Sequence, residues 1–236
     1  MRKMDRNNPH TLCVSIAAAT VDQALALAAL AEESADVIEI RLDSLASPAV
    51  KPFTEKVHKP LLFTNRPAWE GGSYKGDEEK RLQLLIEAAE CGAAFIDVEL
   101  KTDAQLRRRI IAAARQAETR TIISWHDFKT TASRPALESI LQEQYRSGAE
   151  IGKIVTMAHD FAEVLRVLDL QVPAREMGFP LIAFCMGRAG MISRVATLEL
   201  GGFMTYAAPD HGLPTAPGQL PASFLKNFLA HFPAHD

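Results

Sequence analysis

Short apolar segments alternate with longer amphipathic segments along the whole chain. The apolar segments are rich in Val, Ile, Leu and Phe and have the length of buried β-strands. We expect strands at Leu12–Ile16, Val37–Arg41, Leu61–Thr64, Phe95–Glu99, Thr121–Trp125, Ile151–Val155, Leu181–Cys185 and Phe203–Tyr206. The amphipathic segments predict helices at Val21–Glu33, Asp77–Cys91, Asp103–Gln116, Arg134–Ser147, Phe161–Asp169, Met191–Leu198 and Pro221–His231, with a weaker one at Pro48–Val57.

The predicted strands begin at intervals of roughly 22 to 34 residues, about the length of one βα unit. Eight such units predict an α/β fold, a (β/α)8 TIM barrel, and 236 residues suit a single domain over 1–236. A Rossmann fold would need a glycine fingerprint after an early strand, and Ser15–Ala19 has none. In such a barrel, catalytic residues lie at the carboxyl ends of strands and in the loops that follow.

Composition narrows the class of protein. Apolar residues make up 47% and charged residues 23%, typical of a globular protein with a large core. A net charge of −3 without a long basic block disfavours nucleic acid or a membrane as partner. No CxxC spacing joins Cys13, Cys91 and Cys185, so we expect buried free thiols and no metal site. The polar N-terminus lacks a signal-peptide pattern, and we expect a cytoplasmic protein.

A lysine interrupts the sixth predicted strand. Lys153 stands in Glu150–Val155, where every inward position should be apolar. Burial disfavours the ammonium form of a lysine and leaves an amine that can attack a carbonyl carbon. The alternative is a buried ion pair with an inward carboxylate such as Glu99, and both interpretations stay open on this residue alone.

The fifth predicted strand ends near a histidine. His126 lies where a barrel strand becomes a loop, the position expected of an acid/base group. A lone histidine is more often structural, so its address in the barrel is the only argument for chemistry.

Two strands carry charged residues two positions apart, which places each pair on one strand face. Glu39 and Arg41 should face the barrel interior, as substrate contacts or as a structural ion pair. Asp97 and Glu99 are expected to pair with Lys or Arg side chains and to set the field around the site.

Loops after other strands supply further charge. Arg66 and Glu70 precede a diglycine, and a surface ion pair is the alternative to a site role. Arg194 falls at the start of a predicted helix, where the helix dipole disfavours a cation, so it suits a carboxylate ligand. Thr215 and Gln219 lie in a long loop that suits a lid or an ordinary surface connection.

These residues together, in this order, resemble type I 3-dehydroquinate dehydratase. The resemblance runs from about Leu12 to the final helix. Its motifs are Glu-x-Arg at Glu39 and Arg41, Arg-x3-Glu-Gly-Gly from Arg66 to Gly72, Ser-x-His-Asp-Phe around His126, Lys-Ile at Lys153, Met-Gly-x2-Gly-x2-Ser-Arg ending at Arg194, and Ala-Pro-Gly-Gln ending at Gln219. The segment before Leu12 looks short for the β-hairpin that often closes the bottom of the family's barrel.

The resemblance implies a reaction, syn dehydration of 3-dehydroquinate to 3-dehydroshikimate in the shikimate pathway. Lys153 would form an imine with the C3 ketone, and His126 would remove the C2 proton and protonate the departing hydroxyl. Glu70 resembles the carboxylate that orients His126. The family needs no metal or other cofactor, and its members are usually homodimers.

The resemblance also implies a substrate-binding set. It comprises residues for the ring hydroxyls, residues for the carboxylate and lid, and packing or supporting residues: Glu39, Arg41 and Arg66; Arg194, Thr215 and Gln219; Met186 and Ser15. The alternatives are a class I aldolase acting on another keto substrate, or a barrel without catalytic function. Arg194 suits a carboxylate better than the phosphate site common in sugar-phosphate aldolases, and a scaffold has no use for both Lys153 and His126.

Overall fold

The computed structural model describes residues 10–232. The expectations for the polar N-terminus and for a closing hairpin concern residues 1–9, which lie outside the described residues. Eight parallel strands form one sheet in the order β7-β6-β5-β4-β3-β2-β1-β8. The strands are β1 (Leu12–Ile16), β2 (Val37–Arg41), β3 (Leu61–Thr64), β4 (Phe95–Glu99), β5 (Arg120–Asp127), β6 (Ile151–Met157), β7 (Leu181–Met186) and β8 (Thr205–Ala207).

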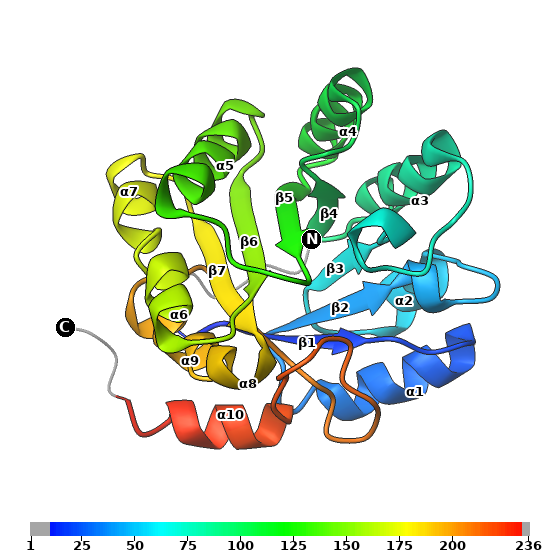
Figure 1. The fold of residues 1–236 in the computed structure, drawn as a ribbon. Helices are drawn as coiled ribbons and strands as arrows, with labels where there is room; N and C mark the ends of the chain where they lie inside the picture. The colour runs from blue at the N-terminus through cyan, green and yellow to red at the C-terminus, as the bar shows by residue number, and fades with distance from the viewer. Residues whose placement is uncertain (1–9, 233–236) are drawn as a thin grey trace.

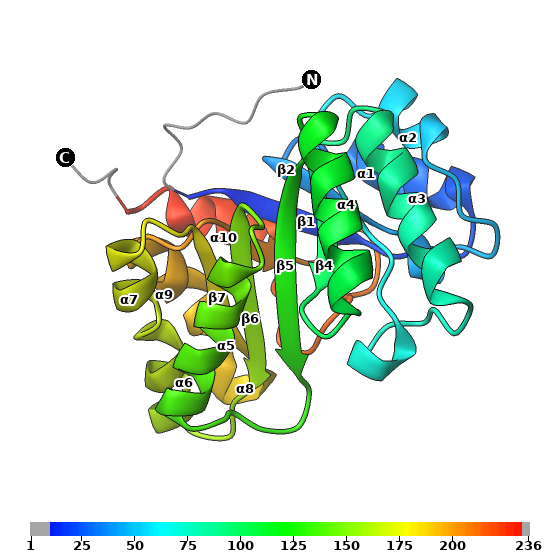
Figure 2. The ribbon, with the colours of Figure 1, turned by 90° about the horizontal axis from the view of Figure 1, so that it is seen from above.

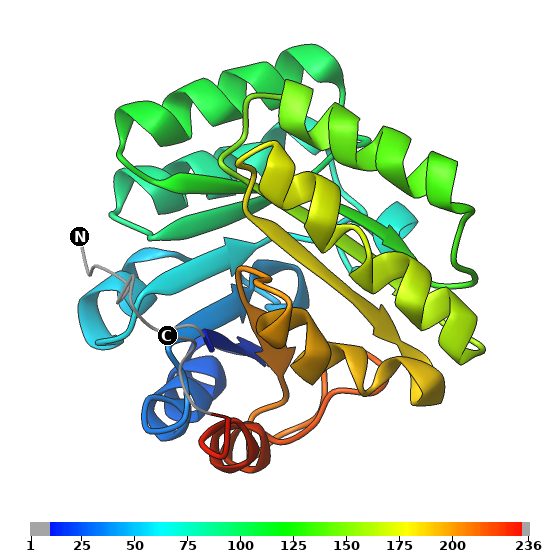
Figure 3. The ribbon, with the colours of Figure 1, turned by 90° about the vertical axis from the view of Figure 1, so that its left-hand side faces the viewer.

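The sheet curls into a nearly closed (β/α)8 barrel, and the helices lie around the outside of the strands (Figure 1). Figure 2 shows α1 to α4 along one side and α5 to α9 along the other, and Figure 3 shows α10 beside α1. The helices are α1 (Val21–Ala31), α2 (Lys51–Lys56), α3 (Glu78–Glu90), α4 (Ala104–Gln116), α5 (Arg134–Arg146), α6 (Phe161–Leu168), α7 (Gln171–Glu176), α8 (Gly187–Gly190), α9 (Ser193–Glu199) and α10 (Ala222–Leu229).

Side chains alternate across the barrel wall as the strand period requires. On β2, Ile38 and Ile40 pack outward in the layer between strands and helices, whereas Val37 belongs to the inner cluster. That inner cluster fills the lower barrel and includes Phe95 and Ile182. The upper interior is therefore left to the polar residues that interrupt the apolar strands.

The predicted barrel is confirmed, with shifts at several element ends. Strands β5 and β6 run further than expected because their ladder continues to Asp127 opposite Thr156. The eighth strand begins later than Phe203, whose N–H instead donates to the Leu181 carbonyl at 2.8 Å across the seam between β7 and β8. Helices α7 and α8 were not predicted; Pro173 lies in the first turn of α7, where proline is tolerated.

The cysteines are free thiols, as expected. Cys13 and Cys185 are buried, but Cys91 is half-buried at the end of α3, so the expectation of burial was wrong for it. Within residues 10–232, no helix has the length and apolarity needed to cross a membrane.

Candidate active site

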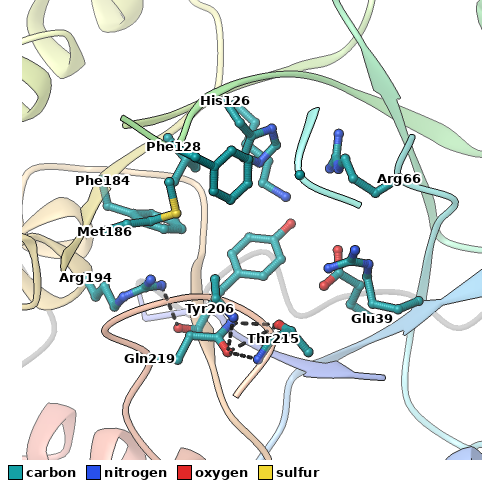
Figure 4. Close-up of a pocket in the computed structure, with 15 residues that line it drawn as sticks. Glu39, Arg66, His126, Phe128, Phe184, Met186, Arg194, Tyr206, Thr215 and Gln219 are labelled. Atoms are coloured by element: carbon teal, nitrogen blue, oxygen red, sulfur yellow. Dashed lines mark hydrogen bonds between the residues drawn. The ribbon is translucent and has the colours of Figure 1, made fainter. Parts of the chain in front are cut away.

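A cavity opens at the carboxyl ends of the strands. Figure 4 shows Tyr206 between Arg194 on one side and Glu39 and Arg66 on the other. The cavity is lined by Glu39, Arg41, Arg66, Gly71, His126, Phe128, Lys153, Val155, Phe184, Met186, Arg194, Tyr206, Thr215, Ala216 and Gln219. Most of the predicted site residues therefore meet in one place, while Glu70 and Ser15 lie behind its wall.

Lys153 lies inside the barrel on β6 and is only 4% exposed. Its Nζ donates to Asp97 Oδ2 at 3.0 Å and lies 4.1 Å from the centroid of the Tyr206 ring. The ion-pair partner is thus Asp97 and not Glu99, the carboxylate considered from the sequence. The ion pair left open from the sequence is therefore present with another partner, and because Lys153 also faces the cavity, its role as a nucleophile stays a prediction.

Arg66 links the two carboxylates of β4. Its guanidinium lies 2.8 Å from Asp97 and 2.7 Å from Glu99, and it donates to Ser124 Oγ at 2.7 Å. Arg66 is 4% exposed, so a surface pair with Glu70 is ruled out. Burial by itself would raise the pKa of Asp97, but Arg66 and Lys153 hold it well below its ordinary value. Asp97 is therefore an anion beneath the amine.

Glu70 and His126 form a second pair. Glu70 Oε1 accepts the His126 backbone N–H at 3.0 Å and lies 2.9 Å from Nδ1. An oxygen that accepts one N–H at this position favours a proton on Nδ1, which leaves the Nε2 lone pair free. Burial lowers the pKa of His126 well below 6.5, with Arg66 and Lys153 acting in the same direction. Burial also raises the pKa of Glu70 to about 8.

The loop that carries Glu70 has a turn at Gly71, which lies against the aromatic ring that covers His126. Gly71 follows in the left-handed region at φ 78°, where a side chain would be strained and would collide with Phe128. The Phe128 ring stacks on His126 with centroids 5.9 Å apart. The turn therefore buries Glu70 behind the imidazole and leaves room for the aromatic cover.

The charged residues of β2 do not pair with each other, contrary to the structural alternative. Arg41 forms its ion pair with Asp43 at 2.7 Å. Glu39 accepts the Thr64 hydroxyl at 2.7 Å and the Ser15 hydroxyl. Ser15 is fully buried and also accepts the Thr215 hydroxyl at 2.9 Å, so it supports two cavity residues from behind.

Arg194 is a fully buried cation near the start of α9. It donates to two carbonyls, of Tyr206 at 3.3 Å and of Pro217 at 3.1 Å, and its Nε has no partner within residues 10–232. Burial lowers its pKa to about 10. No carboxylate of the described part of the chain forms an ion pair with it, which leaves the charge available to an anionic ligand.

Hydrogen bonds within the loop hold together the segment that was expected to form a lid. Gln219 Oε1 accepts the backbone N–H of Thr215 at 2.7 Å, which closes the turn over the cavity. Gly218, at φ 77°, lies close to the backbone of Gly187, the first residue of α8. The loop thus presents the Thr215 hydroxyl and the Gln219 amide beside Arg194.

Three aromatic cavity residues were missed from the sequence, Phe128, Phe184 and Tyr206. Tyr206 is 4% exposed, and its hydroxyl has no hydrogen-bond partner among residues 10–232. Burial raises the pKa of this phenol well above 10, so it is a neutral donor. An aromatic residue on a barrel strand is typical of core packing, which hid Tyr206. Phe128 stood inside the motif around His126 but carried no assigned role.

The comparison with known proteins decides the family. The sequence profile described as type I 3-dehydroquinase matches residues 12–234. The chain belongs to the type I 3-dehydroquinase family. A 3-dehydroquinate dehydratase from Desulfotalea psychrophila is 45% identical to this chain over 222 residues, which cover 94% of the chain and 98% of the relative. The family predicted from six short motifs is therefore confirmed, and the aldolase alternative is wrong.

Solved structures agree with this type I 3-dehydroquinase assignment. The 3-dehydroquinate dehydratase from Enterococcus faecalis has a TM-score of 0.81 at 29% identity and covers 94% of both chains. The type I enzyme from Clostridium difficile, solved with covalently modified comenic acid, has a TM-score of 0.84 at 26% identity and covers 94% of this chain and 92% of its own.

Proposed function

We propose that this type I 3-dehydroquinase dehydrates 3-dehydroquinate to 3-dehydroshikimate by syn elimination through an imine on Lys153. The observation that carries the proposal is the placement of the Lys153 amine, buried against Asp97 and facing a cavity that also holds His126 and Arg194. The reaction needs no metal or organic cofactor, since a lysine imine supplies the electron sink.

Lys153 carries the covalent step. Its Nζ attacks the C3 ketone, and loss of the carbonyl oxygen as water leaves a C=N bond. The protonated imine withdraws electrons from C2 and so acidifies the C2 proton. Asp97, 3.0 Å from Nζ, stabilises the positive charge that develops on this nitrogen.

His126 performs the proton transfers. Its strand pairs directly with that of Lys153, so the imidazole reaches the carbon next to the imine. Nε2 removes the C2 proton, and the resulting imidazolium returns a proton to the departing C1 hydroxyl, which leaves as water. Water then adds to the C=N bond and hydrolyses it, which releases 3-dehydroshikimate and restores the Lys153 amine. Glu70 holds the imidazole in place through Nδ1 at 2.9 Å. Such an acid/base group contributes about 10²–10⁴-fold to a rate.

The remaining residues hold an anionic polyol. Arg194 binds the substrate carboxylate, with Thr215 and Gln219 closing above it. Glu39, Arg41 and Arg66 bind the ring hydroxyls. Met186 packs against the ring at the end of β7 and is 1% exposed.

Ser15 takes a different role from the direct substrate contact implied by the resemblance. Because it does not line the cavity, we assign it to the support of Glu39 and Thr215.

The C. difficile relative with covalently modified comenic acid supports covalent chemistry in this family.

We further propose that the chain acts in the cytoplasm as a homodimer, as the family resemblance implies. Size-exclusion chromatography with light scattering tests the assembly. A mass of twice 25.9 kDa is expected, and a monomer at micromolar concentration contradicts it.

The activity is tested by following the absorbance of the conjugated enone product after 3-dehydroquinate is added. We expect steady product formation whose rate is the same with and without EDTA. No absorbance change would contradict the proposed reaction, and loss of the rate in EDTA would contradict a mechanism without a metal.

A further inference from the structure

One buried carboxylate contacts both the arginine at the end of β2 and the loop that follows β3. Asp43 lies in the 3₁₀ turn Leu42–Ser44, directly after β2, and its side chain is 1% exposed. Its Oδ1 accepts Arg41 Nε at 2.9 Å and the Arg66 backbone N–H at 3.1 Å. Its Oδ2 accepts Arg41 Nη2 at 2.7 Å and the Ser73 backbone N–H at 3.0 Å. Each oxygen therefore holds one donor of the arginine and one donor of the loop.

The contact with Arg41 sets the direction of its guanidinium group. Asp43 accepts two parallel hydrogen bonds from the edge formed by Nε and Nη2, an arrangement that fixes the plane of an arginine fork. Arg41 lines the cavity, and this arrangement leaves its Nη1 group for a substrate hydroxyl. Burial by itself would raise the pKa of Asp43, but the hydrogen bonds and the charge of Arg41 hold it below its ordinary value. Asp43 is therefore the anion that the fork requires.

The contact with the loop joins its two ends. Arg66 and Ser73 stand at the ends of this loop, and Glu70 lies between them. The Glu70 carboxylate in turn lies 2.9 Å from His126 Nδ1. A backbone shift at the base of the loop would displace the group that holds the imidazole, and a displacement of about 1 Å can cost about 100-fold in rate.

Closure of the turn after β2 does not account for the carboxylate. The Leu45 N–H closes that turn by donating to the Leu42 carbonyl at 3.2 Å. The hydrogen bonds of the Asp43 side chain reach only Arg41 and the loop after β3. Asp43 does not line the cavity, so it can affect the reaction only through these neighbours.

We propose that Asp43 is a positioning residue, which aligns the Arg41 guanidinium for the ring hydroxyls of the substrate and fixes the loop that orients His126. The inference rests on the proposed function, in which Arg41 binds the substrate and His126 transfers protons. It assigns to one buried carboxylate the alignment of both a binding group and an acid/base group.

Steady-state kinetics of Asp43→Asn, Arg41→Met and the double variant test the two contacts separately. Asparagine keeps the shape of the side chain, but it removes the charge and turns an NH2 group toward hydrogen-bond donors. We expect Asp43→Asn to raise KM about tenfold and to lower kcat about tenfold. Arg41→Met should raise KM about tenfold and change kcat much less. The double variant should keep the KM of Arg41→Met and the kcat of Asp43→Asn, because the effect on substrate binding passes through Arg41.

Arg41→Lys gives a second measurement that leaves Asp43 in place. A lysine cannot donate two parallel hydrogen bonds to one carboxylate, so its KM should rise almost as far as that of Arg41→Met. A wild-type KM in Arg41→Lys would overturn the inference, since the alignment of a fork would then be unnecessary. This variant decides if Asp43→Asn does not fold.

Asp36→Asn is the matched control. Asp36 also accepts a backbone N–H, that of Leu12 at 2.9 Å, but it precedes β2 at the amino end of the barrel. The control should keep the KM and kcat of wild type. Circular dichroism checks the folding of every variant. Borohydride trapping at saturating substrate counts the active sites, so that kcat is expressed per trapped site.

Wild-type KM and kcat per trapped site in folded Asp43→Asn would overturn the inference, even with fewer sites trapped, because a purely structural role gives that result. A KM raised about 100-fold in the double variant would also overturn it, since Asp43 would then act independently of Arg41. A raised KM at unchanged kcat would reject the role in the loop, and the reverse would reject the role at Arg41.

Failure of the proposed function is recognised separately, because borohydride and substrate would then leave no adduct on wild-type Lys153. Trapping in wild type together with wild-type constants in Asp43→Asn would reject only the role of Asp43.

Discussion

Replacing Arg194 with methionine separates two effects of this cation: it lowers the stability of the free protein, and it raises the affinity for the substrate. Arg194 is fully buried, hydrogen-bonds only to carbonyls, and has no carboxylate partner within residues 10–232. Methionine keeps most of the side-chain volume and removes the charge. We expect the free variant to be more stable than wild type and to bind substrate more weakly.

The structure sets the size of both effects. Burial lowers the pKa of Arg194 from 12.5 to about 10, which corresponds to about 3–4 kcal/mol at ~1.4 kcal/mol per pKa unit. A substrate carboxylate can recover that energy by neutralising the buried charge. The carbonyls of Tyr206 and Pro217 lose a donor, so the gain in stability of the free variant should be about 1–2 kcal/mol. The loss of substrate binding should approach about 100-fold.

Urea denaturation and steady-state kinetics measure the two quantities. We expect the midpoint of Arg194→Met to rise and its KM for 3-dehydroquinate to increase about 100-fold, with kcat changed much less. Arg194→Lys keeps a charge but not the fork, so its KM should fall between the two. A variant that is less stable than wild type and keeps the wild-type KM would refute the claim that Arg194 is unpaired in the free protein and binds the substrate carboxylate.

Three further predictions concern the catalytic centre. His126→Ala should lower kcat by about 10²–10⁴-fold while borohydride still traps substrate on Lys153, and wild-type turnover would remove His126 from its role. Tyr206→Phe deletes one buried, unpartnered hydroxyl, so a substrate hydrogen bond of about 1 kcal/mol predicts a KM increase of about fivefold, and an unchanged KM would contradict that contact. Because burial keeps the pKa of His126 well below 6.5, the imidazole stays a base as pH falls through 6.5, and the acidic limb of kcat/KM should lie below that pH. A wild-type limb centred at 6.5 or above would contradict this ionisation.

The barrel was predictable because its strands are buried on both faces and repeat at the length of a βα unit. Lys153 and His126 could be selected for a related reason: each is polar where the predicted architecture requires apolar packing or a strand end. Such residues can be recognised from the sequence alone because they interrupt its apolar pattern. Their family was then confirmed by comparison.

The ion-pair partners of the buried charged residues could not be predicted in the same way. Glu99 pairs through Ser124 with Lys153 in strand register, yet Lys153 contacts Asp97. Barrel strands tilt, so residues level in the ladder lie at different heights along the barrel axis. The same difficulty affects Arg41, which turns to Asp43 in the loop after its own strand instead of to Glu39.

Arg81 and Tyr206 show a second limit. An arginine in an amphipathic helix is usually solvated, and an aromatic residue on a strand is usually packing. Only the three-dimensional placement of Arg81 against Glu99 and of the Tyr206 ring against Lys153 distinguishes them from those common cases.

The central claim is the covalent use of Lys153, and borohydride reduction during turnover tests it most directly. Intact-mass spectrometry should show one substrate-derived adduct, and peptide mapping should place it on Lys153. Lys153→Met should give no adduct. Turnover by the wild type without any adduct, or an adduct on another lysine, would contradict the imine mechanism.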